Sequence, residues 1–164
     1  MNKITDTKTF KKVLSSLPLN QQRQVGAHFV RNVLDLTDGR CTNQAQILAG
    51  KSDVTPEELE AAYHAVHAVY VSTNPRSDFS ELDFSMQAAH FVAEACMTTV
   101  RPVYSENRQH HLAGNAASYC RMARMCSAIH HEGDSPNFSL AEKGVNKEME
   151  AQYAILNKYL EENS

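Results

Sequence analysis

The sequence predicts an all-α fold, a single-domain antiparallel helical bundle of about six helices over residues 1–164. Apolar residues recur at helical spacing along nearly the whole chain, and no segment alternates convincingly between apolar and polar residues as a half-buried strand does. The composition also favours helix, because Ala, Glu, Gln, Met and Leu are plentiful beside five Pro and six Gly. Short connections between the expected helices make neighbouring helices antiparallel.

The first two helices are expected within residues 7–36. One forms at about 7–17, in an N-terminal segment 1–17 that is rich in charges. After the break "LPLN", Asn20 is a candidate N-cap for a second helix that runs to about Leu36. Gly39 should end that helix in a left-handed conformation. One face of the second helix is apolar and carries Val25, Phe29, Val33 and Leu36.

A short helix should follow over "NQAQILAG" and close at Gly50, and the next helix has a clear start. Thr55 is the predicted N-cap, Pro56 occupies the first helical position, and Glu58 completes a capping box. The residues expected to face the core at helical spacing are Leu59, Tyr63, Val66 and Tyr70.

The segment 84–100 is apolar on nearly all sides, which predicts a central helix that ends before Pro102. Its expected core residues are Phe91, Val92 and Ala95. If Phe91 is buried, its replacement by Ala should cost about 3–5 kcal/mol.

Two further helices complete the expected bundle. One covers about 107–131 and ends at Gly133, with His130 and His131 in a last turn where positive charge is favourable. The other covers about 140–160, in the C-terminal segment 140–164. It is one-sided in hydropathy and should pack across the outside of the bundle.

Bulk composition limits the function classes. A length of 164 residues fits one domain, and 42% apolar residues are enough to bury a sizeable core. The net charge of −3 gives no basic face overall, so we expect no nucleic-acid partner. No apolar stretch reaches the roughly 20 residues that span a bilayer, and no signal peptide is visible. We therefore expect a cytoplasmic protein with no membrane partner.

No CxxC spacing links the cysteines, which are expected to be free and mostly buried: Cys41, Cys96, Cys120 and Cys126.

Histidines and glutamates at helical spacing raise the question of a metal site. Glu60, His64 and His67 share one side of their helix, and His90 and Glu94 share one flank of the next. One interpretation is an inter-helix Zn, Mn or Fe site, in a metal-binding helical-bundle protein or metalloenzyme. Its ligands would be His64 and His67 with His90 or His111, and with Glu60 or Glu94 as a ligand or hydrogen-bond acceptor.

The other interpretation needs no metal or other cofactor, and it is the one we expect. These histidines would then be half-buried flank residues, and Glu94 would pair with His90 or with an arginine. The Glu-x-x-His pair of di-iron proteins and the His-Glu-x-x-His of zinc proteases are both absent from the sequence.

No catalytic constellation is visible, since the sequence lacks a Gly-x-Ser-x-Gly elbow, a phosphate-binding glycine loop and a dinucleotide fingerprint. We therefore expect a protein that binds a macromolecule and performs no catalysis. Arg121 and Arg124 are expected on a solvated helix face. With Met125 they could instead form a partner-binding patch, because Arg and Met are enriched at interfaces.

The order of several segments resembles that of the all-α immunity proteins of bacterial toxin–immunity systems. The segments are "VGAHFVRNVLDLTDG", "VTPEELEAAYHAVHAVYVS", "MQAAHFVAEACMTTV", "HHLAGNAASYCRMA" and "EMEAQYAIL", over roughly residues 25–156. Within them, His111, Gly114, Ala116 and Tyr119 form a His-x-x-Gly-x-Ala-x-x-Tyr stretch. The resemblance implies a non-enzymatic protein-binding module whose partner is another protein, such as a toxin.

Overall fold

The computed structural model describes residues 3–37, 39–74, 83–102, 111–130 and 135–164. These residues form seven α-helices and no strand, which confirms the predicted all-α class. The helices are α1 (Thr7–Ser16), α2 (Leu19–Arg31), α3 (Arg40–Ala49), α4 (Pro56–Ser72), α5 (Phe84–Val100), α6 (Leu112–Ile129) and α7 (Ala141–Glu162), with short 3-10 helices η1 (Leu34–Leu36) and η3 (Phe138–Leu140). None of the described helices is both long enough and apolar enough to cross a membrane.

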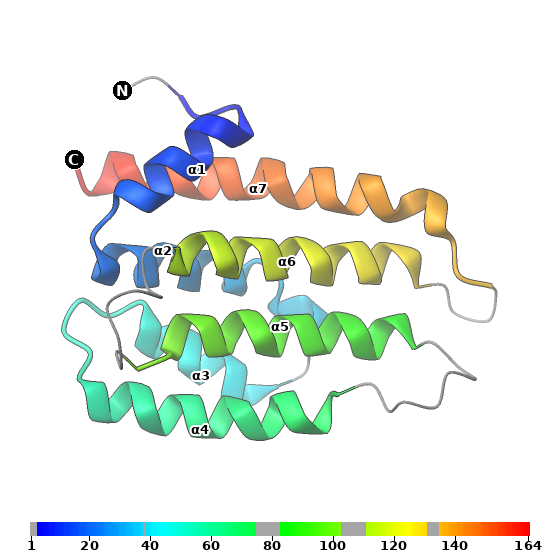
Figure 1. The fold of residues 1–164 in the computed structure, drawn as a ribbon, viewed down its shortest axis with the longest axis horizontal. Helices are drawn as coiled ribbons and strands as arrows, with labels where there is room; N and C mark the ends of the chain where they lie inside the picture. The colour runs from blue at the N-terminus through cyan, green and yellow to red at the C-terminus, as the bar shows by residue number, and fades with distance from the viewer. Residues whose placement is uncertain (1–2, 38, 75–82, 103–110, 131–134) are drawn as a thin grey trace.

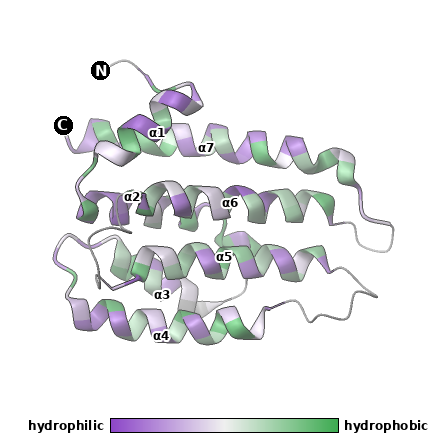
Figure 2. Cartoon of the chain, in the orientation of Figure 1, coloured by the Kyte–Doolittle hydropathy of each residue, from purple (hydrophilic) through white to green (hydrophobic). Residues whose placement is uncertain are grey.

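The helices form an antiparallel bundle with two layers (Figure 1). α4, α5, α6 and α7 lie side by side in one layer, while α2 packs behind α5 and α6 and α3 packs behind α4 and α5. α1 crosses the end of the bundle where α6 and α7 meet. α7 covers α6 from the outside, as the sequence predicted, and alternates between hydrophilic and hydrophobic residues along its length (Figure 2).

The predicted central helix is confirmed, because α5 contacts α2, α3, α4 and α6. Val92 and Ala95 are fully buried, as expected, but Phe91 is only half-buried. Phe91 packs against both apolar clusters with part of its ring exposed, so the condition for the predicted cost of truncation is not met. Among the phenylalanines that the structure describes, Phe29 is the most deeply buried, and it packs from α2 against the ring of Phe10 at a centroid distance of 5.8 Å.

The start of α4 follows the sequence prediction in every detail. The Thr55 hydroxyl accepts the Glu58 N–H at 3.2 Å, and the Glu58 carboxylate accepts the Thr55 N–H at 2.9 Å. Pro56 occupies the first helical position. The expected end of α3 at Gly50 is also confirmed, since Gly50 donates its N–H to the Gln46 carbonyl at 3.1 Å.

Three predicted helix boundaries were wrong. Asn20 lies inside the first turn of α2, whose N-cap is Pro18. α2 ends at Arg31, and a turn at 32–33 leads to η1, which ends at Leu36; the Asn32 carbonyl beyond the end of α2 accepts a hydrogen bond from Arg124. Gly39 is not a left-handed cap: its φ is −77°, and it is the N-cap of α3.

The predicted range of α6 was also too long. α6 begins at Leu112, after His111 in a turn, and ends at Ile129, so that His130 follows the helix in an extended conformation. Residues 107–110, His131 and Gly133 lie outside the described part of the chain.

Truncation of Phe29 should destabilise the protein much more than truncation of a phenylalanine at the surface. We expect Phe29→Ala to lower the free energy of unfolding by about 3–5 kcal/mol, because it leaves a cavity between α1 and α2. The matched variant Phe138→Ala removes a ring that is 63% exposed and should cost less than about 1 kcal/mol. Urea denaturation followed by circular dichroism measures both values, and equal losses would contradict this placement of the core.

Candidate functional site

The outer face of α4 carries a stripe of exposed residues. Glu57, Ala61, His64, Ala68 and Val71 are all exposed and follow one another at helical spacing along one side of α4. Val71 is 58% exposed, which is high for a large apolar side chain. α4 forms an edge of the layer (Figure 1), so this side faces away from the other described helices. We call these five residues the α4 stripe.

The α4 stripe lies on an acidic helix. Glu57, Glu58 and Glu60 are exposed near the start of α4, and the helix contains no Lys or Arg. The His64 imidazole lies 3.9 Å from the Glu60 carboxylate, measured from Nε2 to Oε1. A face of this charge attracts a positively charged partner.

A row of rings connects the flank of α4 to α5. The His67 ring stacks on Tyr63 and Tyr70, with centroid distances of 6.3 and 6.1 Å. Tyr70 lies 4.3 Å from the His90 ring, whose Nδ1 is 3.3 Å from the Thr73 hydroxyl. The His67 and His90 rings therefore each contact tyrosine rings.

Glu94 lies beyond this row, one turn after His90 on α5. The Glu94 carboxylate raises the pKa of the Tyr70 phenol by repulsion of the phenolate. Burial, together with the same carboxylate, raises the pKa of Tyr119 from α6. The predicted neighbour of Glu94 is His90 or an arginine, whereas the structure places Tyr70 and Tyr119 beside it. Both phenols are therefore held in the neutral form, in which each can donate a hydrogen bond.

The structure does not assemble the alternative metal site. Across 3–37, 39–74, 83–102, 111–130 and 135–164, no three His, Cys, Asp or Glu side chains are placed to bind one ion. His67 and His90 contact tyrosine rings, as described above. His111 lines a pocket against α1, and α1 and α4 lie at opposite edges of the bundle (Figure 1). His111 therefore cannot join His64 and His67 in one coordination sphere.

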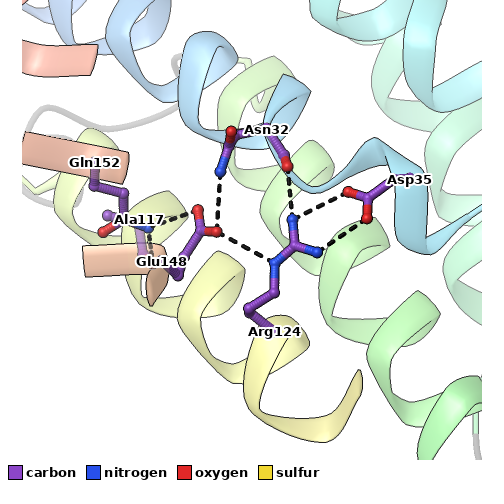
Figure 3. Close-up of polar contacts among 6 residues, drawn as sticks. All are labelled: Asn32, Asp35, Ala117, Arg124, Glu148 and Gln152. Atoms are coloured by element: carbon purple, nitrogen blue, oxygen red, sulfur yellow. Dashed lines mark hydrogen bonds and ion pairs between the residues drawn. The ribbon is translucent and has the colours of Figure 1, made fainter. Parts of the chain in front are cut away.

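Several polar side chains that are distant in the sequence meet around Arg124 (Figure 3). Its guanidinium makes two parallel hydrogen bonds to the Asp35 carboxylate, at 2.9 and 3.0 Å, and a third to the Asn32 carbonyl at 2.7 Å. On the other side, Nε lies 3.4 Å from Glu148 Oε2, which also accepts a hydrogen bond from the Asn32 amide at 3.0 Å. The Arg124 network thus joins η1, α2, α6 and α7.

Gln152 extends the network to Arg121. Its amide nitrogen donates to the Ala117 carbonyl at 3.0 Å, and its oxygen accepts a hydrogen bond of 2.7 Å from Arg121. Arg121 also donates to the Ser118 hydroxyl at 3.0 Å. The expected solvated face was therefore wrong, because Arg121 and Arg124 turn toward α7, and the Arg124 side chain is only 16% exposed. Met125 is half-buried, against the small cluster around Phe84 and Ile129.

The acceptors of this network, Glu148 and Gln152, were not predicted from the sequence. Both are almost completely buried, at 1% and 0% exposure. They continue the buried face of α7 that also contains Gly144 and Leu156. A carboxylate and an amide four residues apart within an apolar helical stripe are the signal that could have identified them.

Three cysteines are confirmed as buried free thiols, namely Cys96, Cys120 and Cys126. Burial raises the pKa of the Cys96 thiol to about 12 and moves the pKa of Cys120 in the same direction. Since the thiolate is the nucleophile, these two thiols are unreactive at neutral pH.

Removal of the Glu148 carboxylate should destabilise the bundle strongly. We expect Glu148→Ala to lower the free energy of unfolding by about 3 kcal/mol, because it leaves part of the Arg124 charge and the Asn32 amide without their acceptor and removes one of the two acceptors of the Gln152 amide. The matched variant Glu150→Ala, at an exposed position of α7, should change it by less than about 0.5 kcal/mol. Urea denaturation of both proteins makes the comparison. A Glu148→Ala protein as stable as the control would show that the network does not hold α7.

Acid should weaken the same network through Asp35. The hydrogen bonds from Arg124 lower the pKa of Asp35 below its ordinary value of 3.8. Its stabilising contribution is therefore present above that value and is lost as the pH falls toward the lower pKa of the folded state. Between about pH 5 and about pH 3, the native chain should lose more stability than the Asp35→Asn variant.

The two proteins in this comparison share Glu148, whose pKa is raised by burial and whose contribution therefore changes with pH in the opposite direction. Its effect cancels between them. Asp53→Asn, at an exposed position remote from Arg124, serves as the control and should behave as the native chain does. Parallel pH profiles for the native chain and Asp35→Asn would be evidence against the ion pair.

Comparison with known proteins assigns no function to this arrangement of residues. No protein-family model matches the chain, and no curated protein or solved structure is significantly similar to it. The resemblance to immunity proteins therefore stays a prediction.

Proposed function

We propose that the chain is a non-enzymatic protein-binding module, and that it binds a basic protein partner through the α4 stripe. The observation that carries the proposal is the exposed apolar surface of Ala61, Ala68 and Val71 on a helix whose charged residues are all acidic. Buried apolar area supplies binding free energy, and complementary charge selects and orients the partner. An immunity-type protein that neutralises a basic toxin is the biological role that combines these properties with the resemblance.

The ring row beside the stripe supports the same role. Tyr63, His67 and Tyr70 place amphipathic rings along the flank of α4. Tyrosine is enriched at the energetically important positions of interfaces, because its ring buries a large area and its hydroxyl still finds a polar partner. The stripe would form the apolar centre of the interface, with the rings and the glutamates at its rim.

The test is capture of a defined partner followed by variants of α4. The product of the gene that neighbours this one in its native genome is the first candidate. The chain should bind it with sub-micromolar affinity in a calorimetric titration. Ala68→Glu should weaken binding about tenfold or more, because it places a charge at the apolar centre of the interface. Ala154→Glu, at an exposed position of α7, is the matched control and should leave the affinity within about twofold.

Charge reversal tests the electrostatic part separately. Glu57→Lys combined with Glu58→Lys should lower the association rate and reduce its dependence on salt. Equal affinities of Ala68→Glu and Ala154→Glu for a captured partner would exclude α4 as the binding face. Turnover of a small substrate that a single His or Glu substitution abolishes would overturn the non-enzymatic role.

A further inference from the structure

A pocket of about 400 Å³ lies between α1 and the first half of α6. Its volume is in the range of small-ligand sites, roughly 300–1,000 Å³. α1 contributes Lys11, Lys12 and Ser15, and α6 with its preceding turn contributes His111, Ser118 and Arg121. The pocket is on the side of the bundle opposite α4 (Figure 1), so it is separate from the proposed protein-binding face.

The charges around this pocket have one sign. Three permanently basic side chains line it, those of Lys11, Lys12 and Arg121, and none of its described lining residues is Asp or Glu. The chain as a whole carries a net charge of −3, so the positive charge of the pocket is local and opposite in sign to the net charge. Clustered cations around a concave space attract an anion.

Arg121 supplies the second observation. Its guanidinium is half-buried, and its two described hydrogen bonds go to neutral groups, the Gln152 amide oxygen at 2.7 Å and the Ser118 hydroxyl at 3.0 Å. Arg124, one turn further along α6, is paired with the carboxylates of Asp35 and Glu148. The Glu148 carboxylate acts on Arg121 without a described hydrogen bond between the two, so an anion in the pocket would supply a direct counter-charge to a guanidinium removed from water.

Gly114 supplies the third observation. It lies in the first turn of α6 and lines the pocket, and a Cβ atom added there would meet no atom within 4 Å. By contrast, a Cβ at Gly144 would lie 2.8 Å from the Ala128 Cβ. Glycine weakens a helix relative to alanine, and at Gly114 no neighbouring atom requires it. The missing side chain leaves room for a ligand to approach the backbone of α6.

We propose that this pocket binds a small organic phosphate, a phosphomonoester. The phosphoryl group would accept hydrogen bonds from Arg121 and from the lysines of α1. A dianion with three terminal oxygens uses several cationic donors at once, whereas a carboxylate offers two oxygens and one charge. The volume beyond the phosphoryl group accommodates the organic part of the ligand.

Isothermal titration calorimetry of the full chain tests the proposal at constant ionic strength. The probes are phenyl phosphate and inorganic phosphate, with benzoate as the carboxylate control. We expect saturable binding of phenyl phosphate, weaker binding of inorganic phosphate, and still weaker binding of benzoate. Lys11→Gln combined with Lys12→Gln should weaken phenyl phosphate binding about tenfold or more. Lys8→Gln changes an exposed lysine of α1 that does not line the pocket, and it should leave binding within about twofold.

Gly114→Ala tests the cavity without a change of charge. It should raise the melting temperature of the free protein, because alanine favours the helix, and also weaken phenyl phosphate binding by filling the open space. A purely structural role of Gly114 does not give this combination. Absence of saturable binding, benzoate bound as tightly as phenyl phosphate, or Lys8→Gln as damaging as the double variant would each overturn the proposal.

Discussion

The guanidinium of Arg124 is the point at which the separate parts of the bundle are held in register. It binds the carboxylate of Asp35 and the carbonyl of Asn32 on one side and Glu148 on the other, so one side chain of α6 joins α2, η1 and α7. Glu148 is buried, and a buried carboxylate is tolerated only with such partners. The position of α7 on the bundle is therefore specified by polar contacts as well as by apolar packing.

Close approach of α7 to α6 makes the Arg124 network possible. A side chain at Gly144 would collide with the backbone oxygen of Arg124, at 2.9 Å, so glycine lets the two helices meet there. One turn later Glu148 reaches Arg124, and a further turn later Gln152 reaches the Ala117 carbonyl. At the other end of the bundle, Arg23 of α2 plays a similar part. It donates to the carbonyls of Thr99 and Arg101, where α5 ends.

The polar contacts are unevenly distributed over the helices, and this distribution explains why α4 has an exposed apolar face. Buried or part-buried hydrogen bonds join α2, α3, α5, α6 and α7 to one another, whereas α4 packs mainly through Leu59, Val66 and partly buried tyrosine rings and has the Thr73–His90 contact at its end. Its opposite side keeps Ala61, Ala68 and Val71 in solvent. A helix at the edge of a layer can present such a face without disturbing the core, which suits a binding role. The basic pocket at α1 occupies the other edge of the bundle.

The sequence by itself determined the features that depend on neighbours along the chain. Helical periodicity predicted the class and most helices, and Thr55, Pro56 and Glu58 predicted the start of α4, because capping involves atoms within one turn. Only the tertiary structure decided which polar residues meet. Helical spacing places Arg121 and Arg124 on one face of α6 but does not say that α7 covers that face. The partners Asp35 and Glu148 lie 89 and 24 residues from Arg124 along the chain, and only the packing of α2, α6 and α7 brings them together.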